Sequence, residues 1–375
     1  MNQKKGNLYQ RISLTFILSG TIIGAGILGL PYVFSKAGYL TGIFWLIILG
    51  AIMILTFLYL GEVTLRTKST HQLTGYAEKY LGGKGKQIML FAFLFGIYSA
   101  LLAYLIGEGE SLSFLITGTT NYALAFGFSF WFIMSIIIYR GFKELKEVNF
   151  WAVDGIIIIT LLLVLYYAPE IQIQNITTIY KQNFFVPVGV LIFALMGFTA
   201  IPEMRRSKHS NKFLKNSIIL GALVPIIIYS IFTFIFVGVL GNQVAQVSTL
   251  SLGKLLVTLG ILTMLTSYLI LIYSLRDSLV FDFKIKPKKA FLITTLTPLA
   301  LFIIVFGFNI LSFIQILGIA GVISGGLTGI LILLMNYKSK TKGNRNPEYS
   351  IPINKTIIII ISLIFLVGVV AELFF

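Results

Sequence analysis

The residues with the clearest chemical meaning are glycines and prolines that interrupt two long apolar stretches. The first stretch carries Gly24, Ala25 and Gly26 and runs on to Pro31, and a later one contains Gly197-Phe198-Thr199-Ala200-Ile201-Pro202. A backbone that leaves the helix inside a bilayer exposes N–H and C=O groups that lipid cannot satisfy, so it persists only where protein buries it or where it lines a polar cavity. Two such interruptions at corresponding places in two halves of a chain indicate a binding site near the bilayer midplane.

The chemistry expected at the first break is binding by main-chain dipoles. The helix beyond the break presents free N–H groups to an anion, and the carbonyls before it can hold an ammonium group or a cation. A zwitterion matches both halves. The alternative is close packing of small residues, since Gly20 and Gly24 form a small-xxx-small pair. The predicted substrate-binding residues here are Thr21, Ile22, Gly24, Ala25 and Gly26, with Ile23 as a candidate ligand of a coupling ion.

The second break predicts further contacts with the same solute. Its carbonyls can add to the amine site, and two of its side chains, Phe198 and Thr199, can shape the wall or a gate; the alternative is a kinked helix without a ligand. Aromatic and hydroxyl side chains of segment 87–116 can line a side-chain pocket, although packing is the more common role of such residues. The predicted residues are Phe193, Ala194, Met196, Gly197, Phe198 and Thr199 at the break, and Tyr98, Ser99 and Leu102 in segment 87–116.

Acidic residues inside apolar segments are candidates for ion coupling, because an uncompensated charge at the bilayer centre is costly. Glu108 and Glu110 can line a vestibule, recognise an amine or take up a proton, and the alternative is a solvated helix end. Asp154 can bind or gate a cation, or can pair with Arg140 or Lys146. We take Glu108 and Asp154 as ion-coupling candidates.

The elements that position these residues follow from composition. The 375-residue chain is 57% hydrophobic and 11% charged, with a mean hydropathy of +0.94. Such a composition is typical of an integral membrane protein. We predict an all-α, polytopic fold of about eleven membrane-spanning helices, near residues 12–36, 39–65, 87–116, 121–139, 145–168, 184–203, 213–240, 253–280, 289–308, 310–336 and 353–374.

Charge predicts the orientation. The formal net charge is +16, and of the 29 Lys and Arg residues all but Lys36, Lys181 and Lys254 fall in segments on one side of the predicted membrane. This asymmetry follows the positive-inside rule and places the N-terminus in the cytoplasm. Anionic lipid headgroups account for the basic residues, so no nucleic acid is expected as a partner. The predicted location is the plasma membrane.

Other chemistry is poorly supported by the residues. The chain has no cysteine, which excludes disulfides, thiolate metal sites and thiol catalysis. Its two histidines, His71 and His209, fall in predicted loops, and the carboxylates are scattered. A membrane-embedded enzyme needs convergent acids, histidines or metal ligands at one depth, so we expect no enzyme.

The break positions predict two inverted repeats. An odd number of helices in each unit brings its broken helix in from opposite sides, so that the breaks meet near mid-depth. The predicted parts are a cytoplasmic tail 1–11, a first five-helix repeat 12–168, an extracellular connector 169–183, a second repeat 184–337, a cytoplasmic loop 338–352 and an eleventh span 353–375 that leaves the C-terminus outside.

Three motifs carry a family resemblance: Gly24–Pro31, Gly197-Phe198 followed by Ile201-Pro202-Glu203-Met204, and Thr266-Ser267-Tyr268 leading to Leu275-Arg276-Asp277. Together they resemble the amino acid/auxin permease group, which includes the bacterial aromatic amino acid permeases and belongs to the amino acid/polyamine/organocation superfamily. The resemblance implies a leucine-transporter-type inverted-repeat fold and cation-coupled amino acid transport. It also implies that Thr266 and Ser267 face the first break as sodium ligands, and oxygen ligands suit a hard cation. The acids Glu108 and Glu110 depart from the glycine-rich run that is typical of the group.

We therefore predict a secondary active transporter that carries a neutral amino acid, with aromatic and branched side chains as candidates, by alternating access. The coupling ion is Na⁺ or H⁺, and no other cofactor is expected. The expected partners are the amino acid and the lipid bilayer, with no obligate protein partner. An amino acid sensor or a channel on the same fold is the alternative.

Overall fold

The structure is a computed structural model that describes residues 2–24, 26–140, 159–160, 162–207 and 210–374. Every regular element among these residues is a helix, and no strand occurs in this part of the chain. The prediction of an all-helical fold is confirmed for these residues. The helices of the first half are α1 Asn2–Ile22, α2 Gly26–Ala37, α3 Tyr39–Leu65, α4 Leu73–Thr117 and α5 Ala123–Arg140.

The second half begins after a connector that contains the short helix α7 Ile173–Thr177. Two short helices follow, α8 Pro187–Ala194 and α9 Ala200–Arg206. The remaining helices are α10 Leu214–Leu240, α11 Lys254–Asp277, α12 Pro287–Val305, α13 Phe313–Ala320, α14 Gly326–Lys342 and α15 Lys355–Phe374.

Eight of the described helices are long and apolar enough to cross a membrane, and a ninth span results if α1 and α2 are taken together across their 60° bend. The polytopic membrane class is confirmed at this level. Eleven spans were predicted, and two of the predicted segments account for the difference. Most of 145–168 lies outside the described residues, and 184–203 forms the two short helices α8 and α9.

Several helices extend past the apolar segments that predicted them. α1 is helical from Asn2, within the predicted tail, and α14 continues to Lys342. α4 begins at Leu73 and turns at Gly82, whose φ of 81° lies in the left-handed region that glycine tolerates best. Hydropathy reports where a segment leaves lipid, whereas backbone hydrogen bonds decide where a helix ends, so the two boundaries differ.

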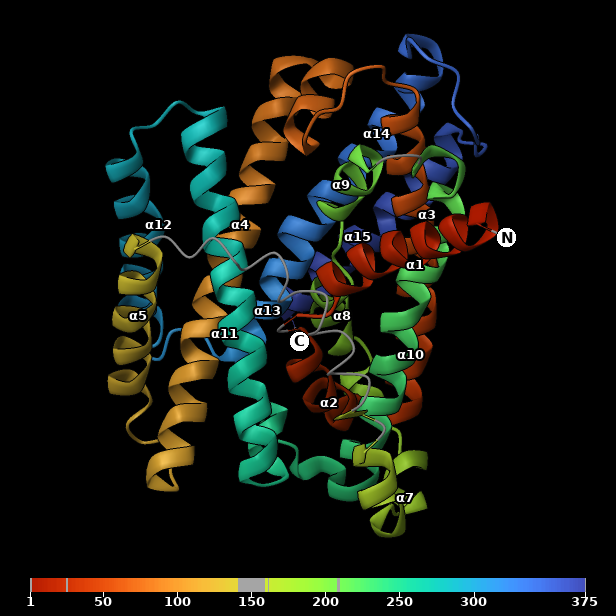
Figure 1. Cartoon of the computed structure of the whole chain (residues 1–375). Helices are drawn as coiled ribbons and strands as arrows, with labels where there is room; N and C mark the ends of the chain where they lie inside the picture. Colours follow the sequence, from red (N-terminus) through yellow and green to blue (C-terminus); the bar gives the residue numbers. More distant parts are fainter. Residues whose placement is uncertain (1, 25, 141–158, 161, 208–209, 375) are drawn as a thin grey trace.

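The helices form two groups (Figure 1). α4 packs against α5, α11 and α12 in one group. In the other group, α10 packs against α1, α2 and α3, and α8 packs against α2 and α3. Each group therefore combines helices from both halves of the chain.

One span, formed by α13 and α14 with a π-helical turn between them, contacts both groups. α13 packs against α4 and α8, and α14 packs against α3 and α4. Between them, Gly321–Gly325 forms a π-helical turn. A Cβ on Gly321 would overlap the carbonyl oxygen of Gly189 in α8, so the backbones of the two spans meet there. π-Helical turns inside helices are frequent at functional sites.

A buried carboxylate holds the end of α3 to α14 and to the segment that follows it. Glu62 is fully buried, and Lys340 of α14 and Arg66 form ion pairs with it at 2.6 and 2.7 Å. Three further groups donate hydrogen bonds to the same carboxylate: the Asn336 amide, the Ser350 hydroxyl and the Ile351 backbone N–H. The segment after α14 is therefore fixed against α3.

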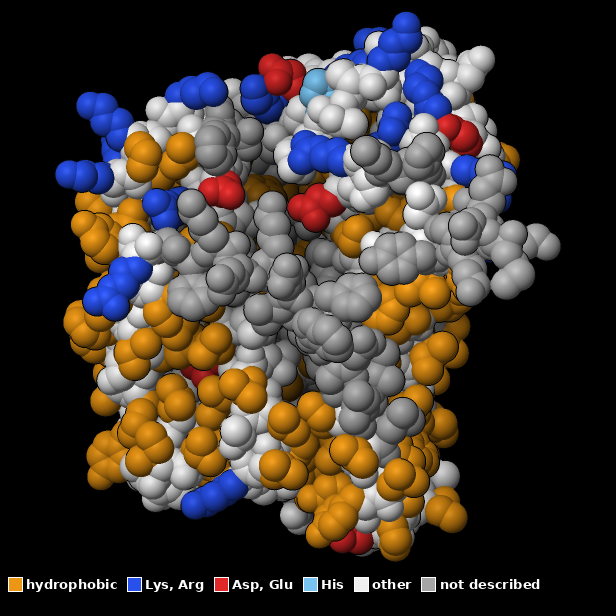
Figure 2. All heavy atoms as spheres, viewed as in Figure 1, with side chains coloured by type: hydrophobic (Ala, Val, Ile, Leu, Met, Phe, Trp, Pro, Cys, Tyr) orange, Lys and Arg blue, Asp and Glu red, His pale blue; other side chains and the backbone are white. Residues whose placement is uncertain are grey.

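Charged side chains gather at one end of the molecule. On the face shown in Figure 2, Lys and Arg are concentrated at the end where α9 and the last turns of α14 lie, and hydrophobic side chains are the most frequent coloured side chains on the described surface below. Many large apolar residues of α5, α12 and α15 are exposed, for example Phe132, Ile304 and Leu363. This surface suits a lipid environment, and the orientation of the two ends stays a prediction.

Candidate functional site

The two predicted helix breaks are present and they meet. α1 ends at Ile22 and α2 starts at Gly26, while α8 ends at Ala194 and α9 starts at Ala200. A Cβ on Gly26 would overlap the Cα and Cβ atoms of Ala194, so the start of α2 lies directly against the end of α8. A Cβ on Gly197 would lie 2.6 Å from the Ile22 side chain. The two interrupted spans therefore touch at their breaks.

The glycines at these breaks provide space rather than a left-handed backbone conformation. None of Gly24, Gly26 and Gly197 has a positive φ. Among the described residues, the glycines with a positive φ are Gly38, Gly82, Gly118, Gly241 and Gly253. At Gly26 the missing side chain lets the backbone approach that of Ala194, and at Gly24 and Gly197 it leaves room for the side chains of Tyr104 and Ile22.

Neither proline marks the end of a break. Pro31 lies inside α2, five residues after the helix begins. Pro202 lies in the first turn of α9, where a missing N–H leaves no intrahelical hydrogen bond unmade. The interruptions are consequently shorter than the sequence motifs: the first lies between Ile22 and Gly26, and the second lies between Ala194 and Ala200.

A tyrosine from a third helix joins the two broken spans. Tyr229 of α10 is fully buried, and its hydroxyl lies 2.9 Å from the carbonyl oxygens of both Ile22 and Ala194. These are the last residues of α1 and α8, where helix carbonyls lack intrahelical partners and the dipole is negative. Sequence analysis missed Tyr229; the available signal was a tyrosine in the middle of an apolar helix, whose hydroxyl must find a partner when buried.

A second missed residue faces the first break from α4. A methyl group on Gly24 would lie 3.3 Å from the Tyr104 hydroxyl oxygen. By contrast, the Tyr98 hydroxyl lies 3.5 Å from the carbonyl oxygen of Ile293 in α12, so it is turned toward that helix. Ser99 is half-buried and Leu102 is buried. The structure thus brings Tyr104 to the breaks, and of the three residues predicted in this segment it turns Tyr98 away.

The predicted residues of the first break differ in exposure. Ile22, Ile23 and Gly26 are buried. Thr21 is exposed, and its hydroxyl donates to the Ile17 carbonyl of its own helix. Ala25 lies outside the described residues.

At the second break, Phe193, Ala194, Gly197 and Phe198 are buried and Thr199 is exposed. The Phe198 ring packs against Phe57 of α3, with centroids 5.3 Å apart. Met196 lies beside the π-helical turn, since its sulfur is 3.0 Å from where a Cβ on Gly325 would lie. Phe198 therefore packs the second break against α3.

The acid Glu108 is fully buried in α4, and neither carboxylate oxygen has a hydrogen-bond partner within the described part of the chain. A solvated helix end is therefore not its environment. Glu108 follows Tyr104 by four residues and lies one turn farther along nearly the same helix face. Glu110 is half-buried, and Asp154 lies outside the described residues.

The two hydroxyl residues of α11 that were predicted as sodium ligands are Thr266 and Ser267. Thr266 donates to the Leu262 and Thr263 carbonyls of its own helix, and Ser267 is half-buried.

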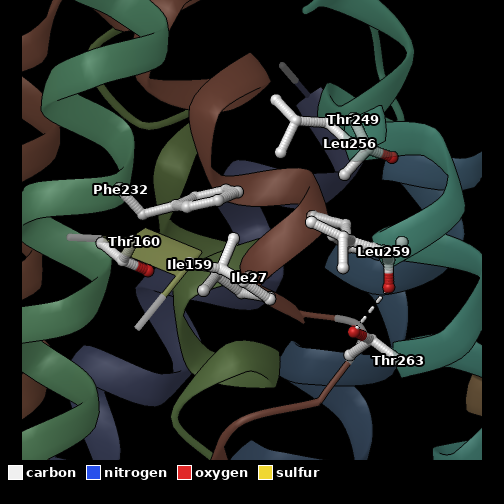
Figure 3. A pocket seen from close by; sticks show the side chains of 10 residues that line it. Ile27, Ile159, Thr160, Phe232, Thr249, Leu256, Leu259 and Thr263 are labelled. Atoms are coloured by element: carbon white, nitrogen blue, oxygen red, sulfur yellow. Dashed lines mark hydrogen bonds between the residues drawn. The ribbon is translucent and has the colours of Figure 1, made fainter. Parts of the chain in front are cut away.

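A cavity of about 40 Å³ lies between α11 and α2. Figure 3 shows Thr263 and Ile27 at this cavity, with the Thr263 hydroxyl bonded to the Leu259 carbonyl. The volume suits one or a few water molecules and is smaller than an amino acid.

The arrangement has the chemistry of a binding site rather than of a catalytic centre. Two converging helix ends supply carbonyl oxygens, and the start of α2 supplies backbone N–H groups beside them. Among the described residues no group of three or more His, Cys, Asp or Glu side chains is placed to hold a metal ion. A polytopic helical chain with broken spans that meet in its interior is of the class that moves small solutes across membranes.

Comparison with known proteins gives the family. The tryptophan/tyrosine permease family matches residues 10–251, which is more than half of the chain and includes both breaks. The chain therefore belongs to this family of membrane amino acid transporters. The family and the relatives that match are membrane amino acid transporters and not enzymes.

Individual relatives are distant. The glutamine transporter 2 of Aliivibrio fischeri is 23% identical over 247 residues, which cover 63% of each chain. The tyrosine-specific transport system 1 of Haemophilus influenzae is 25% identical over 231 residues, covering 58% of this chain and 55% of the relative. The vacuolar amino acid transporter 2 of Saccharomyces cerevisiae is 28% identical over 162 residues, covering 40% and 33%. The chain thus spans less than two thirds of each of these relatives.

Proposed function

We propose that this protein is a secondary active transporter that carries a neutral amino acid across the plasma membrane together with a cation. The observation that carries the proposal is the meeting of the two breaks, where the start of α2 lies against the end of α8. Family membership supports an amino acid as the solute. We also infer that the family falls within the wider amino acid/polyamine/organocation superfamily.

In this proposal the substrate backbone is held by the main chain at the breaks. The carboxylate lies at the N-terminal end of α2, where the first N–H groups have no intrahelical partners. The ammonium group lies beside the carbonyls of Ile22 and Ala194, at the negative ends of α1 and α8. Such contacts are common to all amino acids. The choice among side chains then depends on the walls, where Phe193, Phe198 and Tyr104 are the nearest candidates.

The side chain carried is proposed to be polar or aromatic. Relatives that match the chain are named for glutamine and tyrosine. Both amino acids are neutral, and the side chain of each carries a hydrogen-bond donor. A branched aliphatic side chain remains an outcome of the uptake screen described below.

The coupling ion is proposed to be a proton or a sodium ion. For a proton, the candidate is Glu108, a fully buried carboxyl group one helical turn from Tyr104. For sodium, the candidates are the hydroxyls of Thr266 and Ser267 with the carbonyl of Ile23. The buried, unpartnered carboxylate favours the proton, because an isolated charge in that place is costly and protonation removes it.

Transport is proposed to occur by alternating access between the two helix groups. We infer eleven spans, in which residues 12–168 and 184–337 are inverted repeats. The pairing of breaks supports this, since α1 and α2 correspond to α8 and α9, and α3 corresponds to α10. The group around α10 would then rock against the group around α4, with α13 to α14 contacting both.

Uptake into proteoliposomes tests the proposal. Purified protein is reconstituted, and uptake of tritiated L-tyrosine and L-glutamine is measured with a sodium gradient or a pH gradient imposed separately, with the twenty amino acids as competitors. We expect accumulation under one inward cation gradient and competition by a subset of neutral amino acids. Equal flux with neither gradient would show a channel or facilitator, and no flux of any amino acid would reject the transport proposal.

A pair of glycine variants ties the activity to the breaks. Gly26→Leu places a side chain where Ala194 lies, so substrate binding and uptake should fall to background. Gly83→Leu is the matched control, because a Cβ at Gly83 meets no atom within 4 Å. If Gly26→Leu is inserted normally and retains the affinity of the unmodified protein, the breaks are not the site.

A further inference from the structure

The hydroxyl of Tyr229 occupies an unusual electrostatic position. Two helices end beside it, α1 at Ile22 and α8 at Ala194, and both direct their last carbonyls toward the same point. Helix C-termini carry partial negative charge, and their last carbonyls need donors from elsewhere. Tyr229 is the donor that the structure shows for both, at 2.9 Å from each oxygen.

One hydroxyl proton is shared between two acceptors. A tyrosine hydroxyl has a single O–H, so it satisfies either carbonyl fully or both partly. The site is buried, with Tyr229 and Ile22 exposed by 0% and 3%. In such a place an unpaired carbonyl is costly. The two carbonyl oxygens would therefore be better satisfied by a stronger hydrogen-bond donor.

The ammonium group of an amino acid is that stronger donor. It carries three N–H groups and a positive charge, whereas the tyrosine hydroxyl is neutral. Charge-assisted hydrogen bonds are roughly twice as strong as neutral ones. On the binding mode proposed above, the ammonium group reaches the same two carbonyls that Tyr229 now contacts.

We propose that the Tyr229 hydroxyl takes the place of the substrate ammonium group in the empty carrier, and yields at least one of the two carbonyls when the amino acid binds. This inference rests on the proposed function and assigns Tyr229 as a positioning residue for the unloaded state. It holds α1 and α8 together when no substrate does so.

The inference separates two modes of transport. Net uptake requires the carrier to return empty, with the Ile22 and Ala194 carbonyls paired by Tyr229 alone. Exchange of internal for external substrate returns the carrier loaded, so the ammonium group pairs those carbonyls in both directions. Loss of the hydroxyl should therefore slow net uptake and spare exchange.

The test compares Tyr229→Phe with a matched variant, Tyr268→Phe. Tyr268 is also fully buried in a membrane-spanning helix, and its hydroxyl has no hydrogen-bond partner within the described part of the chain. Both variants are reconstituted, and tritiated L-tyrosine and L-glutamine are measured in net uptake and in exchange against internal unlabelled substrate. For Tyr229→Phe we expect net uptake to fall about tenfold, the effect of one unpaired buried acceptor, with exchange within about twofold of the unmodified protein.

The ratio of the two rates distinguishes the outcomes. An equal loss of net uptake and exchange, or no loss of either, overturns the inference. Tyr268→Phe should leave the ratio unchanged. If the unmodified protein exchanges no amino acid, the proposed function fails first, and this result is distinct from a changed ratio in Tyr229→Phe.

A binding measurement covers the case in which Tyr229→Phe is inactive in vesicles. In detergent, the rise of melting temperature on adding saturating amino acid should be larger for Tyr229→Phe than for the unmodified protein. The reason is that the variant is destabilised mainly when empty. A smaller rise, or none, contradicts the inference.

Discussion

At the scale of single residues, the environment of Glu108 is unfavourable for a charged side chain. Its carboxyl group is fully buried, and neither oxygen accepts a hydrogen bond there. Ser111, one turn farther along, is also fully buried with an unpartnered hydroxyl. Buried polar groups without partners are few in folded proteins and are often functional. The position beside the face of α4 that carries Tyr104 places this acid near the candidate site.

A substitution that keeps the shape of Glu108 and removes its acid function tests the coupling role. Glu108→Gln should lower uptake driven by a pH gradient by about tenfold or more, because an amide cannot bind and release the coupled proton. Exchange, which moves no net proton, should persist. Both rates are measured in proteoliposomes.

The control for this prediction is Glu110→Gln. Glu110 lies two residues farther along α4, on the opposite side of the helix, and is half-buried. It should retain pH-driven uptake. Unchanged coupling in Glu108→Gln, or uptake by the unmodified protein under a sodium gradient alone, would assign the coupling ion elsewhere.

At the scale of elements, a cluster of ion pairs and hydrogen bonds joins α3 to α14. Two cations and three further donors converge on the Glu62 carboxylate. The segment after α14 returns to α3 at more points, since the Tyr59 and Tyr349 hydroxyls donate to the carbonyls of Pro352 and Leu58. These contacts hold α3, α14 and the segment between α14 and α15 together.

Glu62→Gln should therefore destabilise the protein. The variant removes the negative charge that pairs Lys340 and Arg66, whose side chains are 24% and 16% exposed. Breaking a fully buried pair costs about 3–5 kcal/mol, and the partial exposure of the cations reduces this to about 2 kcal/mol. In detergent, the melting temperature should fall by about 2–3 °C.

Glu78→Gln is the control for Glu62→Gln. It removes the Glu78–Lys86 ion pair, whose side chains are 54% and 45% exposed. Such exposed pairs contribute little, so the melting temperature should stay within about 1 °C. Equal shifts for the two variants would mean that the Glu62 cluster does not fix α3 to α14.

At the scale of the whole molecule, the two helix groups and the uneven charge define a direction across the membrane. Basic side chains gather at one end (Figure 2), and the connector with α7 lies at the other end (Figure 1). The positive-inside rule assigns the basic end to the cytoplasm. The absence of cysteine from the sequence makes this assignment directly testable.

Single cysteines report the orientation. Thr70 lies between α3 and α4 and Gln174 lies in α7, and both are exposed. A membrane-impermeant maleimide added to intact cells should label Gln174→Cys at once and Thr70→Cys after permeabilisation. The reverse pattern would invert the predicted topology.

Much of the fold could be predicted because a bilayer restricts what an apolar segment can be. Segment 39–65 matches α3 residue for residue, and 213–240 matches α10 within one residue. The interruptions near Gly24 and Gly197 were also visible, since glycine and proline in a long apolar run have few other uses in lipid. Helix ends beyond the apolar runs, such as Asn2 and Lys342, depend on local hydrogen bonds and were not visible.

By itself the sequence determined that the chain is a helical membrane protein, that two of its spans are interrupted, and which end is basic. Only the tertiary structure decided which side chains face the interruptions. Tyr98, Tyr104, Tyr229 and Tyr268 are alike in sequence, each a tyrosine within an apolar helix. Contacts between helices far apart in the chain turn Tyr98 toward α12, place Tyr104 beside Gly24 and bring Tyr229 to two carbonyls at once. Hydropathy depends on residue type alone, whereas these positions depend on how the helices rotate and pack, which no single segment encodes.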